Sequence, residues 1–310
     1  MDQAAIQLEE LTKVFPSGKK ALDHVTLTVA EGSVFGFLGP NGAGKTTALR
    51  ILAGLAEPTS GTASIFGHDA TRDGFAARSI LGYLPDVPGF YPWMNARQFL
   101  RFAADTFGLA GAPLEKRIDE LLELASLAGE SGKIGGYSRG MKQRLGVVQA
   151  LINSPRLLML DEPTSALDPI GRKELLDLIG SLRGRATVFF STHILSDVER
   201  VCDSVGILNQ GRLVTQASID SLKSRYSGHR IILDLNGGGP AFKAAVENEP
   251  WIEGIEEREE NLFLKVADLD EAQHAIPRVV SGLGIGMRRM EVEAPSLEEV
   301  FVRLTGEVTR

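Results

Sequence analysis

The chain has 310 residues, 43% of them apolar, a formal net charge of −7 and one cysteine, Cys202. This length and apolar content allow a large core and more than one domain, and the acidic balance does not favour a protein that holds nucleic acid by bulk positive charge. A single cysteine excludes an internal disulfide framework and a cysteine-rich zinc site. The N-terminus lacks the pattern of a signal peptide, and no apolar run approaches the roughly 18 residues that span a bilayer, so we expect a cytoplasmic protein.

The N-terminal part is predicted to form two strands, a phosphate-binding loop and a helix. Apolar and polar residues alternate over 6–30, with a turn at Pro16-Ser17-Gly18, which is typical of two half-buried strands. An apolar run, Val34–Leu38, then leads through GPNGAGKTT into a helical pattern over 46–55. A glycine-rich loop in this context points several backbone N–H groups at one anion. A glycine-rich helix cap would explain the loop alone, so the rest of the chain decides. The predicted nucleotide-binding residues here are Gly39, Pro40, Asn41, Gly42, Ala43, Gly44, Lys45, Thr46 and Thr47.

The middle of the chain alternates between helical and short apolar segments. Residues 92–150 carry apolar residues at helical spacing, chiefly in Asn95–Phe107, Leu114–Leu127 and Met141–Leu151. Beyond them, predicted strands alternate with predicted helices, which indicates an α/β fold with a parallel sheet covered on both faces. The predicted strands are Leu157–Leu160, Thr187–Phe190 and Val205–Leu208, and the predicted helices are Gly171–Leu182 and Ile194–Cys202.

After Ser224 the pattern changes, so we assign 1–224 to one domain, with a helical insertion at about 88–150, and 225–310 to a small α+β domain. The predicted order in the small domain resembles a split βαβ, or ferredoxin-like, sandwich. Pro277 weakens one of its helices, because proline removes a hydrogen bond inside a helix. The predicted strands are 230–235, 251–257, 261–267 and 285–293, and the predicted helices are 241–248, 269–282 and 296–305.

Two adjacent carboxylates, Asp161 and Glu162, end the apolar run 157–160. The carboxyl edge of a parallel sheet is where ligands bind. An aspartate at this edge can hold Mg²⁺, and a glutamate beside it can polarise a water for attack on a γ-phosphate. Two neighbouring acidic residues are more often a solvated turn, but the phosphate-binding loop and the all-apolar strand favour the catalytic interpretation.

Taken together, the motifs resemble those of the ATP-binding subunit of an ABC transporter. GPNGAGKTT is similar to the family's Walker A motif and RLLMLDEP to its Walker B motif. The signature motif corresponds to YSRGMKQR at Tyr137–Arg144, the D-loop to SALD at Ser165–Asp168, and the switch histidine to STH at Ser191–His193. The resemblance covers about residues 4–224. It implies a P-loop NTPase fold with an antiparallel β subdomain and a helical insertion, and it implies ATP hydrolysis with Mg²⁺.

The resemblance also implies roles for residues within the chain's own site. Lys45 would hold the terminal phosphates, Thr46 and Asp161 would hold Mg²⁺, Glu162 would activate water, and His193 would orient it. Outside this set, Phe15 could stack on adenine, although a lone phenylalanine is more often part of a core.

Three further residues are implied to act on a second subunit. In the family, two ATPase subunits sandwich ATP head to tail. Ser138 and Gly140, at the start of a predicted helix, would close over the nucleotide of the other chain. Asp168 would contact the opposite site.

Two positions depart from the family pattern. The signature reads SRGMK instead of the common Ser-Gly-Gly-Gln form, so Arg139 adds a positive charge beside Ser138 and Gly140. The Q-loop position, after Gly82-Tyr83-Leu84-Pro85, holds Asp86 in place of glutamine. A carboxylate can bind Mg²⁺ but cannot donate hydrogen bonds as an amide does, so we expect Asp86 to contact the metal or its water.

Two segments indicate a membrane partner. The loop Pro88–Met94 is rich in aromatic residues; in the family this region grips the coupling helix of the membrane subunit, but its side chains could equally cap the helical insertion. PSLEEVFVRLTG, at Pro295–Gly306, resembles the tail of ATPases that serve type-2 exporters, whose permease usually lies on a separate chain. We therefore expect a multi-spanning permease, a second ATPase subunit that we take to be identical, no nucleic acid, and a peripheral location on the inner face of the membrane.

The alternative is a soluble ABC ATPase that acts on ribosomes or DNA. Translation-type members normally carry two cassettes in one chain, and DNA-repair members carry long coiled coils or zinc cysteines. This chain has one cassette and neither of the other features. A cassette that binds ATP without hydrolysing it is disfavoured, because Glu162 and His193 are both present. The transported substrate is not encoded here.

Overall fold

The computed structural model describes residues 4–165, 167–226, 230–258, 261–293 and 297–305. The chain divides into two compact units, Met1–Ile219 and Asp220–Arg310, and each is described by itself. The expected domain boundary at 224 falls inside helix α8 (Ile219–Tyr226). Three predicted segments extend beyond the described residues: the D-loop motif at Ala166, the exporter-like tail at Pro295, Ser296 and Gly306, and the last helix at Ser296.

A six-stranded sheet forms the centre of the first unit, in the order β10-β9-β3-β8-β7-β6. All of its strands are parallel except β10, which pairs antiparallel with β9. Every residue of β3, β7 and β8 is buried, as the apolar runs within these strands predict. The strands are β3 (Val34–Leu38), β6 (Leu81–Leu84), β7 (Leu157–Asp161), β8 (Thr187–Thr192), β9 (Ser204–Asn209) and β10 (Arg212–Ser218).

An antiparallel sheet packs beside it in the order β2-β1-β4-β5. The predicted pair of strands is confirmed as β1 (Ala4–Val14) and β2 (Lys20–Ala30). Strand β4 (Ser60–Ile65) pairs with the other edge of β1, and β5 (His68–Asp69) pairs with β4. Helix α1 (Lys45–Leu52) shares one apolar core with both sheets. The phosphate-binding loop at its start is therefore fixed by a buried element on either side.

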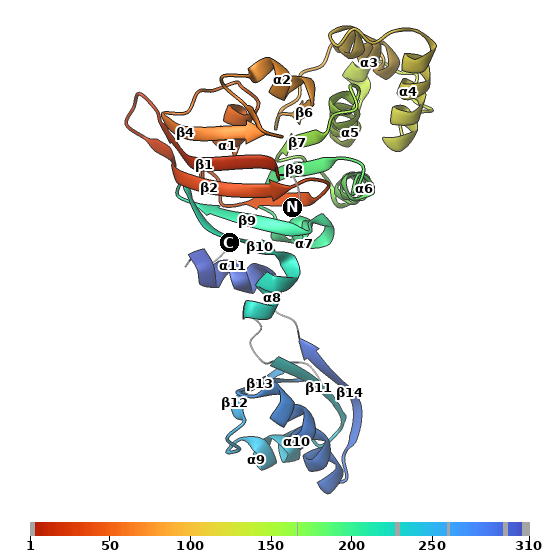
Figure 1. Ribbon diagram of the computed structural model, residues 1–310. Coiled ribbons are helices and arrows are strands. Elements are labelled where there is room, and N and C mark those ends of the chain that lie inside the picture. The colour runs from red at the N-terminus through yellow and green to blue at the C-terminus, as the bar shows by residue number, and fades with distance from the viewer. Residues whose placement is uncertain (1–3, 166, 227–229, 259–260, 294–296, 306–310) are drawn as a thin grey trace. The chain divides into compact units, whose positions relative to one another are not determined.

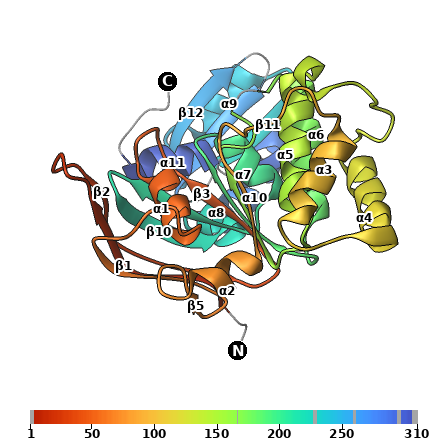
Figure 2. The same ribbon diagram turned by 90° about the horizontal axis from the view of Figure 1, so that it is seen from above.

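The helical insertion is confirmed as α3 (Ala96–Asp105), α4 (Gly111–Leu124) and α5 (Arg139–Ala150), which gather at one side of the sheets (Figure 1, Figure 2). Asn95 and Gln98 form a capping box at the start of α3. Arg101 holds α3 to α4, since its Nε lies 2.6 Å from Glu115 Oε1. The capping box and the ion pair stabilise these helices close to where the apolar periodicity of the sequence predicts them.

Two helices follow the strands that end at the site. They are α6 (Pro169–Ser181) and α7 (Leu195–Val201). Helix α7 lies directly against β3 at Gly36, where a Cβ atom would come within 2.9 Å of Val198 Cγ1. A glycine in the central strand thus allows the segment after His193 to approach the sheet closely.

Sequence periodicity missed the elements between α1 and α3, as well as β10 and α8. The missed elements before α3 are β4, β5, α2 (Gly74–Ser79) and β6. They are short, and β4 reads SGTASI, which has no clear apolar alternation. Their place is set by pairing with β1 and β7, which a local pattern cannot report.

The second unit confirms the predicted ferredoxin-like order. Its antiparallel sheet has the order β12-β13-β11-β14, and its core joins the sheet to α9 and α10. Helix α10 runs through Pro277 without a break and buries Ala272, Ile276 and Val280. The elements are β11 (Arg230–Asn236), α9 (Gly239–Val246), β12 (Ile252–Arg258), β13 (Asn261–Val266), α10 (Leu269–Gly282), β14 (Gly286–Glu293) and α11 (Leu297–Thr305).

Candidate nucleotide-binding and catalytic site

The loop between β3 and α1 has the geometry of a phosphate cradle. A Cβ atom at Gly39 would lie 2.3 Å from the carbonyl oxygen of Leu208, and one at Gly44 would lie 2.3 Å from that of Ala21. Gly44 also has φ +112°, a conformation that side chains disfavour. Only glycine fits at these two positions. The loop backbone can therefore wrap around an anion at the N-terminus of α1.

Lys45, the first residue of α1, lies inside this loop and is only 5% exposed. Its Nζ donates to the carbonyl oxygens of Gly39 (2.7 Å) and Pro40 (3.2 Å). The same Nζ lies 3.1 Å from Glu162 Oε1. The structure thus places the loop lysine and the carboxylate after β7 face to face.

Asp161 ends β7 in a buried group of oxygens. Its Oδ1 accepts hydrogen bonds from Thr46 Oγ1 (3.1 Å) and from Ser191 Oγ (2.6 Å). Burial raises the pKa of the Asp161 carboxyl above its usual value, while the hydrogen bonds from Ser191 and Thr46 lower it. The negative charges of Glu162 and Asp86 also raise this pKa. A nearby cation would relieve the cost of keeping this carboxylate ionised.

Glu162 is held in an unusual backbone conformation with φ 47°. Its backbone N–H donates to the carbonyl oxygen and the Oγ of Ser191, both at 3.1 Å. Its Oε2 lies 2.9 Å from His193 Nδ1, and its buried Oε1 faces Lys45 Nζ at 3.1 Å. Strain of this kind concentrates at functional sites. The carboxylate thus has one oxygen held by His193 and the other paired with Lys45.

Sequence reasoning assigned no role to Ser191, yet this residue joins the Asp161 carboxylate to the backbone of Glu162. It is fully buried on β8, and its side chain contacts both Asp161 and the backbone of Glu162. The sequence offered one indication of this role, because Ser191 is the first residue of the STH segment that ends in His193.

Lys45, Thr46 and Glu162 line a pocket of about 250 Å³, whereas Asp161, Ser191 and His193 are not among its lining residues. Asp86 lines it together with Glu162, so the aspartate at the Q-loop position faces the predicted site. Phe15 stands at the pocket too, 40% exposed, with Lys13 Nζ 5.5 Å from its ring centroid. Sequence reasoning did not single out Lys19 and Ala21. The lining residues are Phe15, Lys19, Ala21, Asn41, Gly42, Gly44, Lys45, Thr46, Thr47, Asp86 and Glu162.

Ser138, Gly140 and Asp168 do not line this pocket. Ser138 caps α5 by accepting from Met141 N–H (3.2 Å), and Asp168 caps α6 by accepting from Gly171 N–H (3.2 Å). A Cβ atom at Gly140 would lie only 4.0 Å from the Cα of Gly171, so the two helix starts are neighbours. The chain therefore carries two separate sets of predicted nucleotide-binding residues.

The oxygen atoms of Thr46 and Asp161 fit Mg²⁺ as ligands. A hydroxyl and a carboxylate oxygen lie 3.1 Å apart, and both are hard oxygen ligands of the kind this ion prefers. No group of three or more histidine, cysteine, aspartate or glutamate side chains in the described parts of the chain could enclose a metal.

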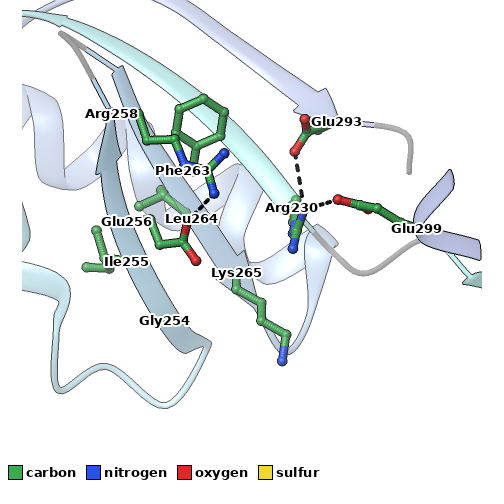
Figure 3. A pocket seen from close by; sticks show the side chains of 10 residues that line it. All are labelled: Arg230, Gly254, Ile255, Glu256, Arg258, Phe263, Leu264, Lys265, Glu293 and Glu299. Atoms are coloured by element: carbon green, nitrogen blue, oxygen red, sulfur yellow. Dashed lines mark hydrogen bonds and ion pairs between the residues drawn. The ribbon is translucent and has the colours of Figure 1, made fainter. Parts of the chain in front are cut away.

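The second unit has a pocket of its own, of about 220 Å³, on the sheet face that carries Phe263 and Lys265 (Figure 3). Its cations are paired: Arg230 Nη1 lies 2.7 Å from Glu299, Arg258 lies 2.7 Å from Glu256, and Lys265 lies 2.6 Å from Glu253. The charges are balanced within the pocket, so we assign no ligand to it.

The strand–loop–helix cradle, the carboxylates after β7 and the histidine after β8 define a P-loop ATPase. Residues 22–165 match the ABC transporter family, and residues 218–305 match the C-terminal domain of DrrA1-3-like ATP-binding proteins. The chain belongs to the ATP-binding proteins of ABC transporters. It is an ATP-hydrolysing transporter subunit, as predicted, and the alternative role on ribosomes or DNA is not supported.

Relatives of this chain resemble it over nearly its whole length. The bacitracin transport ATP-binding protein BcrA of Bacillus licheniformis is 38% identical over 97% of this chain and 97% of its own. The daunorubicin resistance ATP-binding protein DrrA3 of Streptomyces coeruleorubidus is 36% identical over 100% of this chain and 98% of its own. A solved ATP-binding cassette, dimeric and bound to ADP and phosphate after hydrolysis, is 26% identical with a TM-score of 0.62, and the match covers 69% of this chain and 98% of that one. Among the described residues of the present chain, no helix is both long enough and apolar enough to cross a membrane.

Proposed function

We propose that two copies of this chain close head to tail on ATP and thereby drive an exporter permease that lies on a separate chain. The observation that carries the proposal is the division of the site. Lys45 and Glu162 meet in one pocket, while Ser138 and Asp168 cap neighbouring helices outside it. A second copy would supply the missing half. The dimeric cassette and the relatives named for bacitracin transport and daunorubicin resistance support this arrangement.

In this proposal the residues at and beside the pocket have separate tasks. The loop N–H groups and Lys45 hold the β- and γ-phosphates, and Lys45 leaves the carbonyl oxygens of Gly39 and Pro40 to do so. Thr46 and Asp161 hold Mg²⁺, which neutralises charge that develops on the phosphates. Once Lys45 has also left Oε1 of Glu162 for the phosphates, this oxygen accepts a hydrogen bond from the attacking water, and His193 keeps the carboxylate oriented through Oε2.

Asp86 gives a specific prediction at the Q-loop position. If it contacts the metal or its water, Asp86→Ala should lower turnover about tenfold and raise the Mg²⁺ concentration needed for half-maximal rate. Asp86→Asn should retain more activity, because an amide oxygen can still bind the ion. ATPase rates measured across a Mg²⁺ titration check both variants. Unchanged Mg²⁺ dependence and turnover in Asp86→Ala would remove this residue from the metal site.

The aromatic loop Pro88–Met94 places side chains both in the core of the helical insertion and on its surface. The Phe90 ring packs on the buried Phe99, with centroids 5.1 Å apart. Trp93 is 62% exposed and touches Tyr91, which is 39% exposed. The first contact belongs to the core of the insertion. The exposed pair is an unusual surface for a free protein and fits a membrane partner.

Trp93→Ala should therefore lose the permease while retaining the chain's own ATPase activity. The test is an affinity pull-down from detergent-solubilised native membranes, with mass spectrometry of the proteins that co-purify. The wild-type protein should co-purify a multi-spanning permease in near-stoichiometric amount. The amount of permease that co-purifies with the variant should be at least about tenfold lower, as expected for loss of an exposed aromatic anchor. Leu283→Ala, which removes an exposed apolar side chain of the second unit, is the control. Ribosomal or DNA-bound proteins without a permease would contradict the proposal.

A further inference from the structure

A buried carboxylate outside the pocket joins three segments that lead to it. Asp197 lies in the first turn of α7 and is fully buried. Its Oδ1 accepts from Arg172 Nε at 2.6 Å, and its Oδ2 accepts from Thr164 Oγ1 at 2.5 Å. Arg172 Nη2 also donates to Ser196 Oγ at 2.8 Å. A buried carboxylate is costly unless both of its oxygens accept hydrogen bonds. The bonds to Asp197 therefore hold Thr164 and Arg172 at defined positions.

Each partner of Asp197 belongs to a different catalytic segment. Thr164 lies two residues after Glu162, and Asp197 itself lies four residues after His193. Arg172 is in the first turns of α6, where its N–H donates to the carbonyl oxygen of Asp168 at 2.9 Å. The network therefore connects the segment after β7, the start of α6 and the helix after the switch histidine.

We infer that Asp197 is a positioning residue for ATP hydrolysis, which transmits the state of Asp168 to Glu162 and His193. The inference rests on the proposed function, in which Asp168 contacts the second subunit. When a second subunit contacts Asp168, any shift of the start of α6 moves Arg172. The charged hydrogen bonds then carry that shift to α7 and to Thr164. Rigid helices and a fully paired network are the physical means by which such coupling travels.

The same two helices carry a second ion pair that serves as a matched comparison. Arg200 Nη2, on α7, lies 2.7 Å from Asp177 Oδ1, on α6, with side chains 42% and 57% exposed. This pair also ties α7 to α6 but does not contact the segment with Thr164. If the ion pairs only hold α6 to α7, both pairs share this role. Of the two, only the pair of Asp197 also reaches the segment that follows Glu162.

The test compares Asp197→Asn with Asp177→Asn in the full-length protein. Asn keeps the shape of the side chain and removes the charge. Asp197→Asn should lower kcat about tenfold or more and change KM for ATP by less than about twofold, because the bonds it weakens position groups that act on water. Asp177→Asn should leave both constants at wild-type values. If Asp197→Asn does not fold, as judged by its Tm, Thr164→Val removes only the hydroxyl and carries the same expectation.

A double-mutant cycle adds a readout that a structural role would not move. If Asp168 acts through Asp197, the double variant Asp168→Ala/Asp197→Asn should lose no more kcat than the more severe single variant. Additive losses would overturn the inference, and so would an Asp197→Asn protein with the constants of Asp177→Asn. Glu162→Gln is measured in parallel. Loss of turnover there, together with a wild-type Asp197→Asn, would remove only the positioning role, whereas wild-type turnover in Glu162→Gln would remove the proposed catalytic roles as well.

Discussion

A Glu162→Gln variant should still bind ATP but hydrolyse it at least about 100-fold more slowly, as expected when a general base is removed. The amide has nearly the same shape, so the unusual backbone at φ 47° need not change. It cannot accept a proton from the attacking water. Nor does it form an ion pair with Lys45, which the carboxylate does at 3.1 Å. Because binding survives and the chemical step does not, ATP should accumulate in a closed dimer.

Two measurements check this expectation. Phosphate release reports turnover, and size-exclusion chromatography in MgATP reports the dimer. Glu31→Gln, which breaks an exposed ion pair with Arg156, should match wild type in both. A Glu162→Gln protein that stays monomeric at saturating MgATP would contradict closure on ATP, and one with wild-type turnover would remove Glu162 from its role.

Most of the fold could be predicted because its main strands and helices have a recognisable pattern of apolar residues in their own sequence. The buried strands β3, β7 and β8 each contain a short apolar run, and α3 begins at a capping box. By contrast, the short strand β4 is stabilised by its pairing with β1, and its sequence carries no period of its own. Elements of that kind depend on long-range contacts, so they are visible only once the fold is known.

The site shows the same division between local and long-range information. The loop around Lys45 could be predicted because glycine spacing directly determines the backbone path. The face-to-face placement of Lys45 and Glu162 follows from parallel strands that end at one edge, which the sequence also indicated. The buried network at Asp197 could not be foreseen. Its partners Thr164 and Arg172 are distant in sequence from α7 and meet it only through the packing of α6 and α7.

Lys45→Met should abolish ATP binding in the micromolar-to-millimolar range and leave no measurable turnover. Charged hydrogen bonds contribute about 1.5–3 kcal/mol each, and Lys45 would form them with two phosphate groups, so affinity should fall at least about 100-fold. The loss cannot be compensated from within the pocket, because the position is enclosed: Lys45 is 5% exposed and its Nζ already touches Gly39 and Pro40.

Thermal unfolding with and without ATP provides the measurement for Lys45→Met. At a ligand concentration of 100 times Kd, binding stabilises a folded protein by about 2.7 kcal/mol. Wild type should therefore show a clear rise in Tm that the variant lacks at the same ATP concentration. Lys116→Met, on the exposed face of α4 where Lys116 is 81% exposed, removes the same charge away from the loop and should shift as wild type does. A Lys45→Met protein with a wild-type shift would show that the loop lysine does not hold the nucleotide, since every other route to that stabilisation is shared by the two variants.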